Sequence, residues 1–92
     1  MLFQISLLDM IKNIRKTNRG LYFIPVDVEG PINLSDICDY LYNALKDFEF
    51  FEACTVNYSY KIINIEFADY IYRCKFISNN NSFCVYAVKN DD

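Results

Sequence analysis

The stretch "YIYRCKFISNNNSFCVYAV", residues 70–88, decides the fold, because two β-rich runs flank a polar loop of hairpin length. Alternate side chains of a strand share a face. The face of the first run that lacks cations consists of Tyr70, Tyr72, Cys74 and Phe76. We expect this face to be buried and the face with Arg73 and Lys75 to lie outside. The stretch therefore predicts a β-hairpin with one side turned to a core.

The loop of this hairpin predicts which residues pair across it. A loop symmetric about Asn80 pairs Tyr72 with Val88 and Phe76 with Cys84, so that the tyrosine face meets largely apolar partners. On that register the outer face gathers apolar side chains around the two cations. They are Ile71, Ile77, Phe83, Val85 and Ala87.

An apolar patch rimmed by charge is typical of a surface that binds another protein. We therefore expect self-association, most simply as a homodimer, through four of these residues. They are Ile71, Ile77, Phe83 and Val85. The alternative is that the first helix, or the N-terminal "MLFQI", covers the patch.

The segments before the hairpin alternate between helical and strand patterns. The run "SLLDMIKNIRKTNRG" predicts a helix with Ser6 and Asp9 as a capping box and Gly20 as its end. The run "LYFIPV", apolar on both faces, predicts an inner strand. A second helix is expected from Asn33 or Ser35 to about Asp47, with an apolar stripe at helical spacing.

From residue 51 onward the apolar period changes to two, which indicates strands. The segment around Ala68 and Asp69 is compatible with a turn, a bulge or one continuous strand. The expected element order is α-β-α-β-β-β. It predicts one α+β domain over residues 1–92, with two amphipathic helices packed on one face of a four-stranded, mostly antiparallel sheet.

The eight tyrosines raise the question of a recognition platform. Tyr58 and Tyr60 fall on the apolar side of an expected strand, as Tyr72 does, so we expect most rings in the core. Tyr40 lies on the polar side of the second helix and is expected to be exposed. A platform for single strands needs exposed aromatics in a positive groove, whereas this chain has a net charge of −3. Direct binding of nucleic acid is therefore not expected.

Signatures of catalysis are missing from the sequence. There is no histidine, which excludes Ser-His and Cys-His nucleophile pairs, and two glycines cannot build a phosphate-binding loop. The four cysteines include no C-x-x-C pair and are expected to be free, buried and apolar in behaviour. Carboxylate pairs such as Asp36 with Asp39 are typical of a solvated helix face. We expect a protein that is not an enzyme and has no metal site and no cofactor.

Charge is unevenly distributed along the chain. Nine acidic and two basic residues lie between Asp27 and Asp69, a net charge of −7, whereas the first helix is basic. This predicts an acidic surface that binds a protein partner with a basic surface, most simply one that handles nucleic acid. The expected binding residues are Asp36, Asp39, Tyr40, Asp47, Glu49 and Glu52. The alternative is that these charges only keep a small protein soluble.

The apolar run at the N-terminus is too short to span a membrane, and Asp9 and Lys12 interrupt it. We expect a cytoplasmic protein that does not bind membranes. The bias toward Asn, Ile, Tyr, Phe and Lys is typical of AT-rich genomes. In composition, though through no particular residue, the chain resembles small acidic accessory proteins of phages and viruses. Some of those inhibit host defence complexes, including anti-CRISPR and DNA-mimic proteins, and this resemblance implies a similar inhibitory role.

Overall fold

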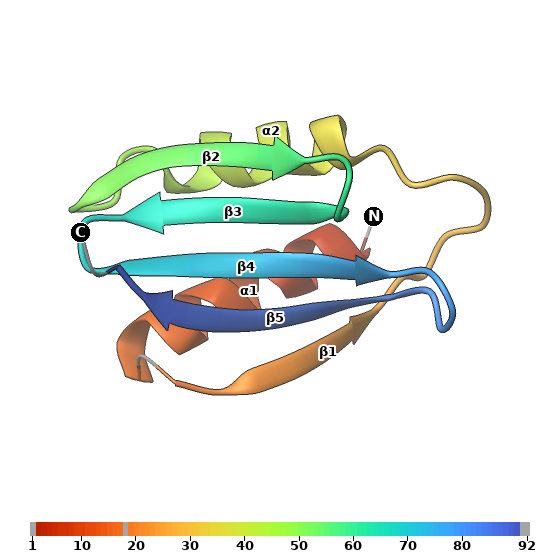
Figure 1. The fold of residues 1–92 in the computed structure, drawn as a ribbon, viewed down its shortest axis with the longest axis horizontal. Helices are drawn as coiled ribbons and strands as arrows, with labels where there is room; N and C mark the ends of the chain where they lie inside the picture. The colour runs from red at the N-terminus through yellow and green to blue at the C-terminus, as the bar shows by residue number, and fades with distance from the viewer. Residues whose placement is uncertain (1, 18, 91–92) are drawn as a thin grey trace.

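The fold is a five-stranded antiparallel sheet with two helices, seen here in a computed structural model that describes residues 2–17 and 19–90. Figure 1 shows both helices behind the sheet, on the same face. The strand order across the sheet is β1-β5-β4-β3-β2. The elements are α1 (Leu2–Thr17), β1 (Leu21–Pro25), α2 (Leu34–Leu45), β2 (Phe51–Asn57), β3 (Ile62–Phe67), β4 (Tyr70–Ile77) and β5 (Ser82–Lys89).

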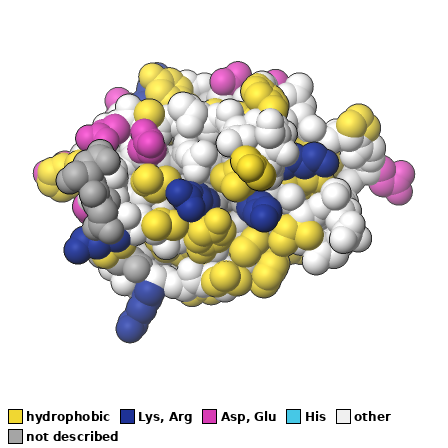
Figure 2. Space-filling view, viewed as in Figure 1, with side chains coloured by type: hydrophobic (Ala, Val, Ile, Leu, Met, Phe, Trp, Pro, Cys, Tyr) yellow, Lys and Arg dark blue, Asp and Glu magenta, His cyan; other side chains and the backbone are white. Residues whose placement is uncertain are grey.

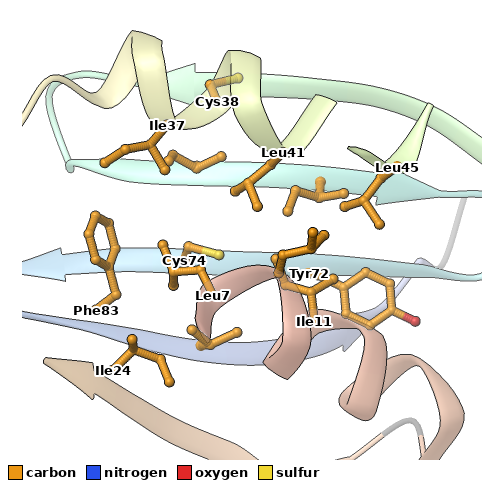
Figure 3. Packing of buried hydrophobic residues seen from close by; sticks show 14 of the residues in the cluster. Leu7, Ile11, Ile24, Ile37, Cys38, Leu41, Leu45, Tyr72, Cys74 and Phe83 are labelled. Carbon is orange, nitrogen blue, oxygen red and sulfur yellow. The ribbon is translucent and has the colours of Figure 1, made fainter. Parts of the chain in front are cut away.

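The core lies between the sheet and the two helices. Leu41 and Leu45 of α2 and Leu7 of α1 are at most 1% exposed and point toward the middle strands (Figure 3). Tyr72 of β4 is the largest side chain that is completely buried there. The other core side chains of the sheet occupy alternate positions along each strand, because successive residues of a strand point to opposite faces. They include Ile24, Ile63, Ile65, Phe67, Cys74, Phe83 and Val85.

The α+β class and the antiparallel arrangement are confirmed, but the predicted number of strands is wrong. Ala68 and Asp69 form a tight connection between β3 and β4, so the two runs are separate strands rather than one. The amide of Ala68 donates to the carbonyl of Phe50, and that of Asn90 donates to the carbonyl of Asp69. These bonds pair backbone groups of the connection with neighbouring segments, and the separation of β3 from β4 gives the sheet its fifth strand.

The predicted start of α2 is confirmed, whereas the predicted start of α1 is wrong. The side chain of Asn33 accepts a hydrogen bond from the amide of Asp36 at 3.2 Å, which caps α2 where expected. The capping box at Ser6 is wrong, because α1 already begins at Leu2. Phe3 is buried and stacks on Phe83 with ring centroids 6.1 Å apart, so α1 packs on the core side of the sheet and does not cover the outer sheet face; Met1 lies outside the described residues.

The predicted register of the last hairpin is wrong by one residue. Phe76 pairs with Phe83 and Ile77 with Ser82, which leaves a turn of residues 78–81. Asn81 ends this turn with a positive φ of 50°, a conformation that asparagine tolerates well. Because side chains alternate, a slip of one residue exchanges the two faces of β5. Phe83 and Val85 are therefore completely buried, and their neighbours in sequence lie on the outer face.

Most tyrosines are not in the core, contrary to expectation. The strand β2 ends at Asn57, and the next four residues form the turn to β3, which again ends in a residue with positive φ, Lys61. Tyr58 and Tyr60 lie in this turn and are 64% and 69% exposed. The prediction for Tyr40 is also wrong, because this residue was expected to be exposed and is half-buried against the core. Only Tyr72 among the tyrosines is completely buried.

Candidate functional site

The acidic side of the protein is formed by α2 and by the segment that joins it to β2. Asp36 and Asp39 are exposed on the outer face of α2 because its buried face is held against the sheet by an apolar stripe. The remaining acids follow where the chain turns into β2. They are Asp47, Glu49 and Glu52, all exposed. The helix α2 lies behind β2 at one edge of the sheet (Figure 1), so the five carboxylates lie on or between the two elements at this edge, which is defined here as the acidic side.

The carboxylates of the acidic side are not neutralised by ion pairs. The only salt bridge within residues 2–17 and 19–90 joins Arg15 to Asp69, far from α2 in sequence. Lys46 is the one cation within the segment that carries the five acids, and its ammonium lies 6.0 Å from the Tyr42 ring. An uncompensated group of like charges creates a negative potential that extends into solvent by about one Debye length, roughly 8 Å at physiological salt.

Of the two tyrosines on α2, the exposed one is not the one expected. Tyr40, predicted as a binding residue, is half-buried, whereas Tyr42 is 44% exposed. The Tyr42 ring also meets Phe51 edge to face, with centroids 5.8 Å apart. A helical spacing of four residues between Tyr42 and Lys46 was the signal in the sequence that could have located this pair on the outer surface.

The outer face of the sheet is a second candidate surface, here called the open sheet face. Figure 2 shows hydrophobic side chains spread over this face, with lysine and arginine side chains among them and acidic side chains toward the margins. Leu21 and Phe23 of the edge strand β1 are 59% and 56% exposed. The other members come from β4 and β5 and are partly exposed, except for Lys75, which is exposed. They are Ile71, Arg73, Lys75, Ile77, Tyr86 and Val88.

The structure brings together only half of the residues expected for self-association. Ile71 and Ile77 lie on the open sheet face. Phe83 and Val85 point into the core, because the observed register of β4 and β5 differs by one residue from the predicted one. The exposure of Leu21 and Phe23 does not follow from the sequence pattern, because "LYFIPV" is apolar throughout and predicts an inner strand. Pro25, which cannot donate a ladder hydrogen bond, is compatible with a strand end as well as with an edge, and it is the last residue of β1.

Arg15 joins α1 to the β3–β4 connection and is the most strongly bonded charged side chain described. Its Nη1 donates to Asp69 Oδ1 at 2.6 Å and to the Tyr72 hydroxyl at 2.9 Å, and the guanidinium lies 4.1 Å from the centroid of the Phe67 ring. Burial lowers the pKa of Arg15, but the bonds to Tyr72 and Asp69 outweigh this and raise it. Burial raises the pKa of Asp69, yet the bond from Arg15 brings it below its ordinary value. This group stabilises the fold.

Possible sites for a small ligand are limited in their chemistry. An open hollow of about 660 Å³ lies between the loop before α2 and the β2–β3 turn. Its lining consists of Pro31, Ile32, Asn33, Leu34, Tyr58, Lys61 and Phe76. Within residues 2–17 and 19–90 no three Cys, Asp or Glu side chains are placed to hold a metal ion. In the same residues no helix is long and apolar enough to cross a membrane.

Comparisons of the chain with models of protein families, with curated proteins and with solved structures find no match. The arguments about function therefore rest on the two surfaces.

Proposed function

We propose that this protein is a non-enzymatic binding module whose acidic side docks on the basic surface of a protein partner that handles nucleic acid. The observation that carries the proposal is the set of five exposed carboxylates on α2, on β2 and on the segment between them, without an ion-pair partner in the described chain. Holding like charges together opposes folding slightly, and a partner with the opposite charge relieves this repulsion. Complementary potentials of this kind also speed association.

A carboxylate array resembles a nucleic acid backbone in its charge, so a basic groove built for phosphates is the matching surface. The protein then acts as an inhibitor that occupies this groove and does not itself bind nucleic acid. Its size, acidity and composition support a role like that of phage and virus accessory proteins that act against host defence complexes, in the manner of anti-CRISPR or DNA-mimic proteins. Such a partner is in the cytoplasm of the host cell, and no membrane is involved.

Neutralising the acidic side is expected to weaken partner binding by about tenfold or more at low salt, and by much less at high salt, because screening already removes long-range attraction there. The variant is Asp36→Asn/Asp39→Asn, and the partner is the protein that the wild type captures from host lysate. Binding of the purified pair is measured by titration calorimetry at two salt concentrations.

The matched control is Asp9→Asn/Glu29→Gln, which removes the same charge from exposed positions outside the acidic side. It is expected to bind as the wild type does. Equal weakening by both variants would mean that net charge alone matters, and unchanged binding by Asp36→Asn/Asp39→Asn would contradict the proposal.

A second candidate function is a structural or regulatory subunit that assembles as a homodimer through the open sheet face. The observation in its favour is the exposure of Leu21 and Phe23 beside the partly exposed Ile71 and Ile77. Two such faces stacked with their apolar residues together resemble the packing of a β-sandwich. Arg73 and Lys75 oppose this by bringing like charges together.

For this second function, sedimentation equilibrium at high micromolar concentration is expected to show dimers of the wild type and monomers of Leu21→Ser/Phe23→Ser. Both substitutions are at exposed positions, so the variant should keep its fold, which circular dichroism checks. A wild type that sediments as a monomer throughout would exclude the homodimer and leave the acidic side as the working surface.

A further inference from the structure

We propose that Cys38 and Cys54 are a modification site, a thiol pair that a low-molecular-weight disulfide such as oxidised glutathione converts to an intramolecular disulfide. Cys38 lies on the inner face of α2, and Cys54 lies on the helix-facing side of β2. Their sulfur atoms are 3.3 Å apart, and the Cys54 thiol also approaches the carbonyl of Cys38 at 3.7 Å. The site does not depend on the proposed function.

The positions of the two sulfurs favour a bond between them. A disulfide has a sulfur separation of about 2.05 Å, so the contact must shorten by about 1.3 Å. Rotation of the two side chains and a small movement of α2 toward β2 provide this. The elements are joined by a short connection that includes Phe50 with a positive φ of 69°, so they are neighbours in sequence as well as in space.

The two thiols differ in access, and this sets the order of steps. Cys54 is partly exposed, whereas Cys38 is 8% exposed beneath α2. The Cys54 thiolate attacks one sulfur of the small disulfide, forms a mixed disulfide and releases one small thiolate. The Cys38 thiolate then attacks the Cys54 sulfur and releases the second. Overall, two protein thiols are oxidised, one small disulfide is reduced, and the two protons end on the two small thiols.

The remaining cysteines are poorer candidates for the same chemistry. Cys74 is completely buried, and burial raises the pKa of its thiol to about 12. Cys84 lies on the open sheet face, because its cross-strand partner is Lys75 and Cys74 pairs with Val85 instead. Cys74 and Cys84 therefore point to opposite sides of the sheet and cannot bond to each other without refolding.

The environment of Cys54 predicts that the reaction is slow near neutral pH. Burial raises the pKa of its thiol, and the contact with Cys38 and the negative charge of Asp39 act in the same direction. Only the thiolate attacks a disulfide. Because the thiolate fraction grows tenfold per pH unit below the pKa, the rate of the first step is expected to rise about tenfold from pH 7 to pH 8.

The test is to incubate the purified full chain with excess oxidised glutathione at pH 8.5, and then to count free thiols and map linked peptides by mass spectrometry. We expect two of the four thiols to disappear, no glutathione adduct to persist, and one linked peptide pair containing Cys38 and Cys54. Since the bond closes a loop between positions 16 apart, the melting temperature is expected to rise by on the order of 10 °C.

Two variants make the result decisive. Cys38→Ser removes the second thiol, so glutathione should remain attached to Cys54 and the melting temperature should not rise. Cys84→Ser should form the link as the wild type does. A wild type that keeps four free thiols at pH 8.5, or that accumulates glutathione on Cys54 or Cys84 without forming the link, would overturn the proposal.

Discussion

Replacing Phe83 by alanine is expected to lower the free energy of unfolding by about 3–5 kcal/mol. The ring is completely buried, stacks on Phe3 of α1 and meets Phe76 of β4 at a centroid distance of 5.3 Å. Its removal leaves a cavity between the sheet and α1 that the surrounding side chains fill only in part. Unfolding in urea, monitored by circular dichroism at low micromolar protein, measures the loss.

The matched control is Phe23→Ala, on the open sheet face of the neighbouring strand, where the ring is 56% exposed. Its effect should stay below about 1 kcal/mol, because little area leaves the core. The loss expected for Phe83→Ala is comparable to the whole stability of a small domain. Phe83→Leu therefore provides a milder substitution that stays folded. If Phe83 lay on the outer face, as the symmetric loop predicts, the two phenylalanine-to-alanine variants would lose similar amounts.

Replacing Arg15 by alanine is expected to lower the free energy of unfolding by about 2–4 kcal/mol. The change leaves the hydroxyl of the buried Tyr72 without its hydrogen-bond donor, and it removes the cation from the face of the Phe67 ring. An unsatisfied buried hydroxyl alone costs about 1–3 kcal/mol. Lys12→Ala, at an exposed position on the same helix, serves as the control and should change stability little.

A double-mutant cycle and a pH series identify the source of this loss. In a Tyr72→Phe background, Arg15→Ala should have a smaller effect, because no hydroxyl is left unpaired. The pKa of Asp69 is below its ordinary value, so its contribution is present above about pH 4 and is lost as the pH falls through the folded pKa. Asp69→Asn should therefore lose stability at pH 7 and converge on the wild type in acid. Additive effects in the cycle would contradict the assigned role of Tyr72.

The elements of this fold could be predicted wherever a strong period coincides with clear end signals. The helix α2 is the best case, because its apolar stripe and the Asn33 cap agree. The hairpin of β4 and β5 was also found, since two β-rich runs flank a loop of asparagines. What could not be predicted was the loop's exact length, because "SNNNS" permits several turns. One residue of difference moves Phe83 from the surface to the core.

Of the two candidate surfaces, one could be predicted in part from the sequence and the other could not. The exposure of Asp36 and Asp39 on the acidic side could be predicted, because acids on the polar face of a helix are almost never fully buried unless they are paired. The composition of the open sheet face could not, because it depends on the hairpin register and on the position of β1. A strand that is apolar on both faces, as β1 is, carries no alternation from which an edge can be recognised.

The strand order has a consequence for synthesis of the chain. The strands β2 to β5 each pair with the next in sequence, but Leu21 of β1 pairs with Tyr86, near the far end of β5. Bringing β1 and β5 together closes a long loop, and the entropic cost of closing it is larger than the cost of closing the local hairpins. On the ribosome, α1 and β1 emerge before the other elements of this fold, and the surface that they cover is completed only when β5 has been translated. The apolar side chains of α1 therefore remain accessible to chaperones until β5 has been translated.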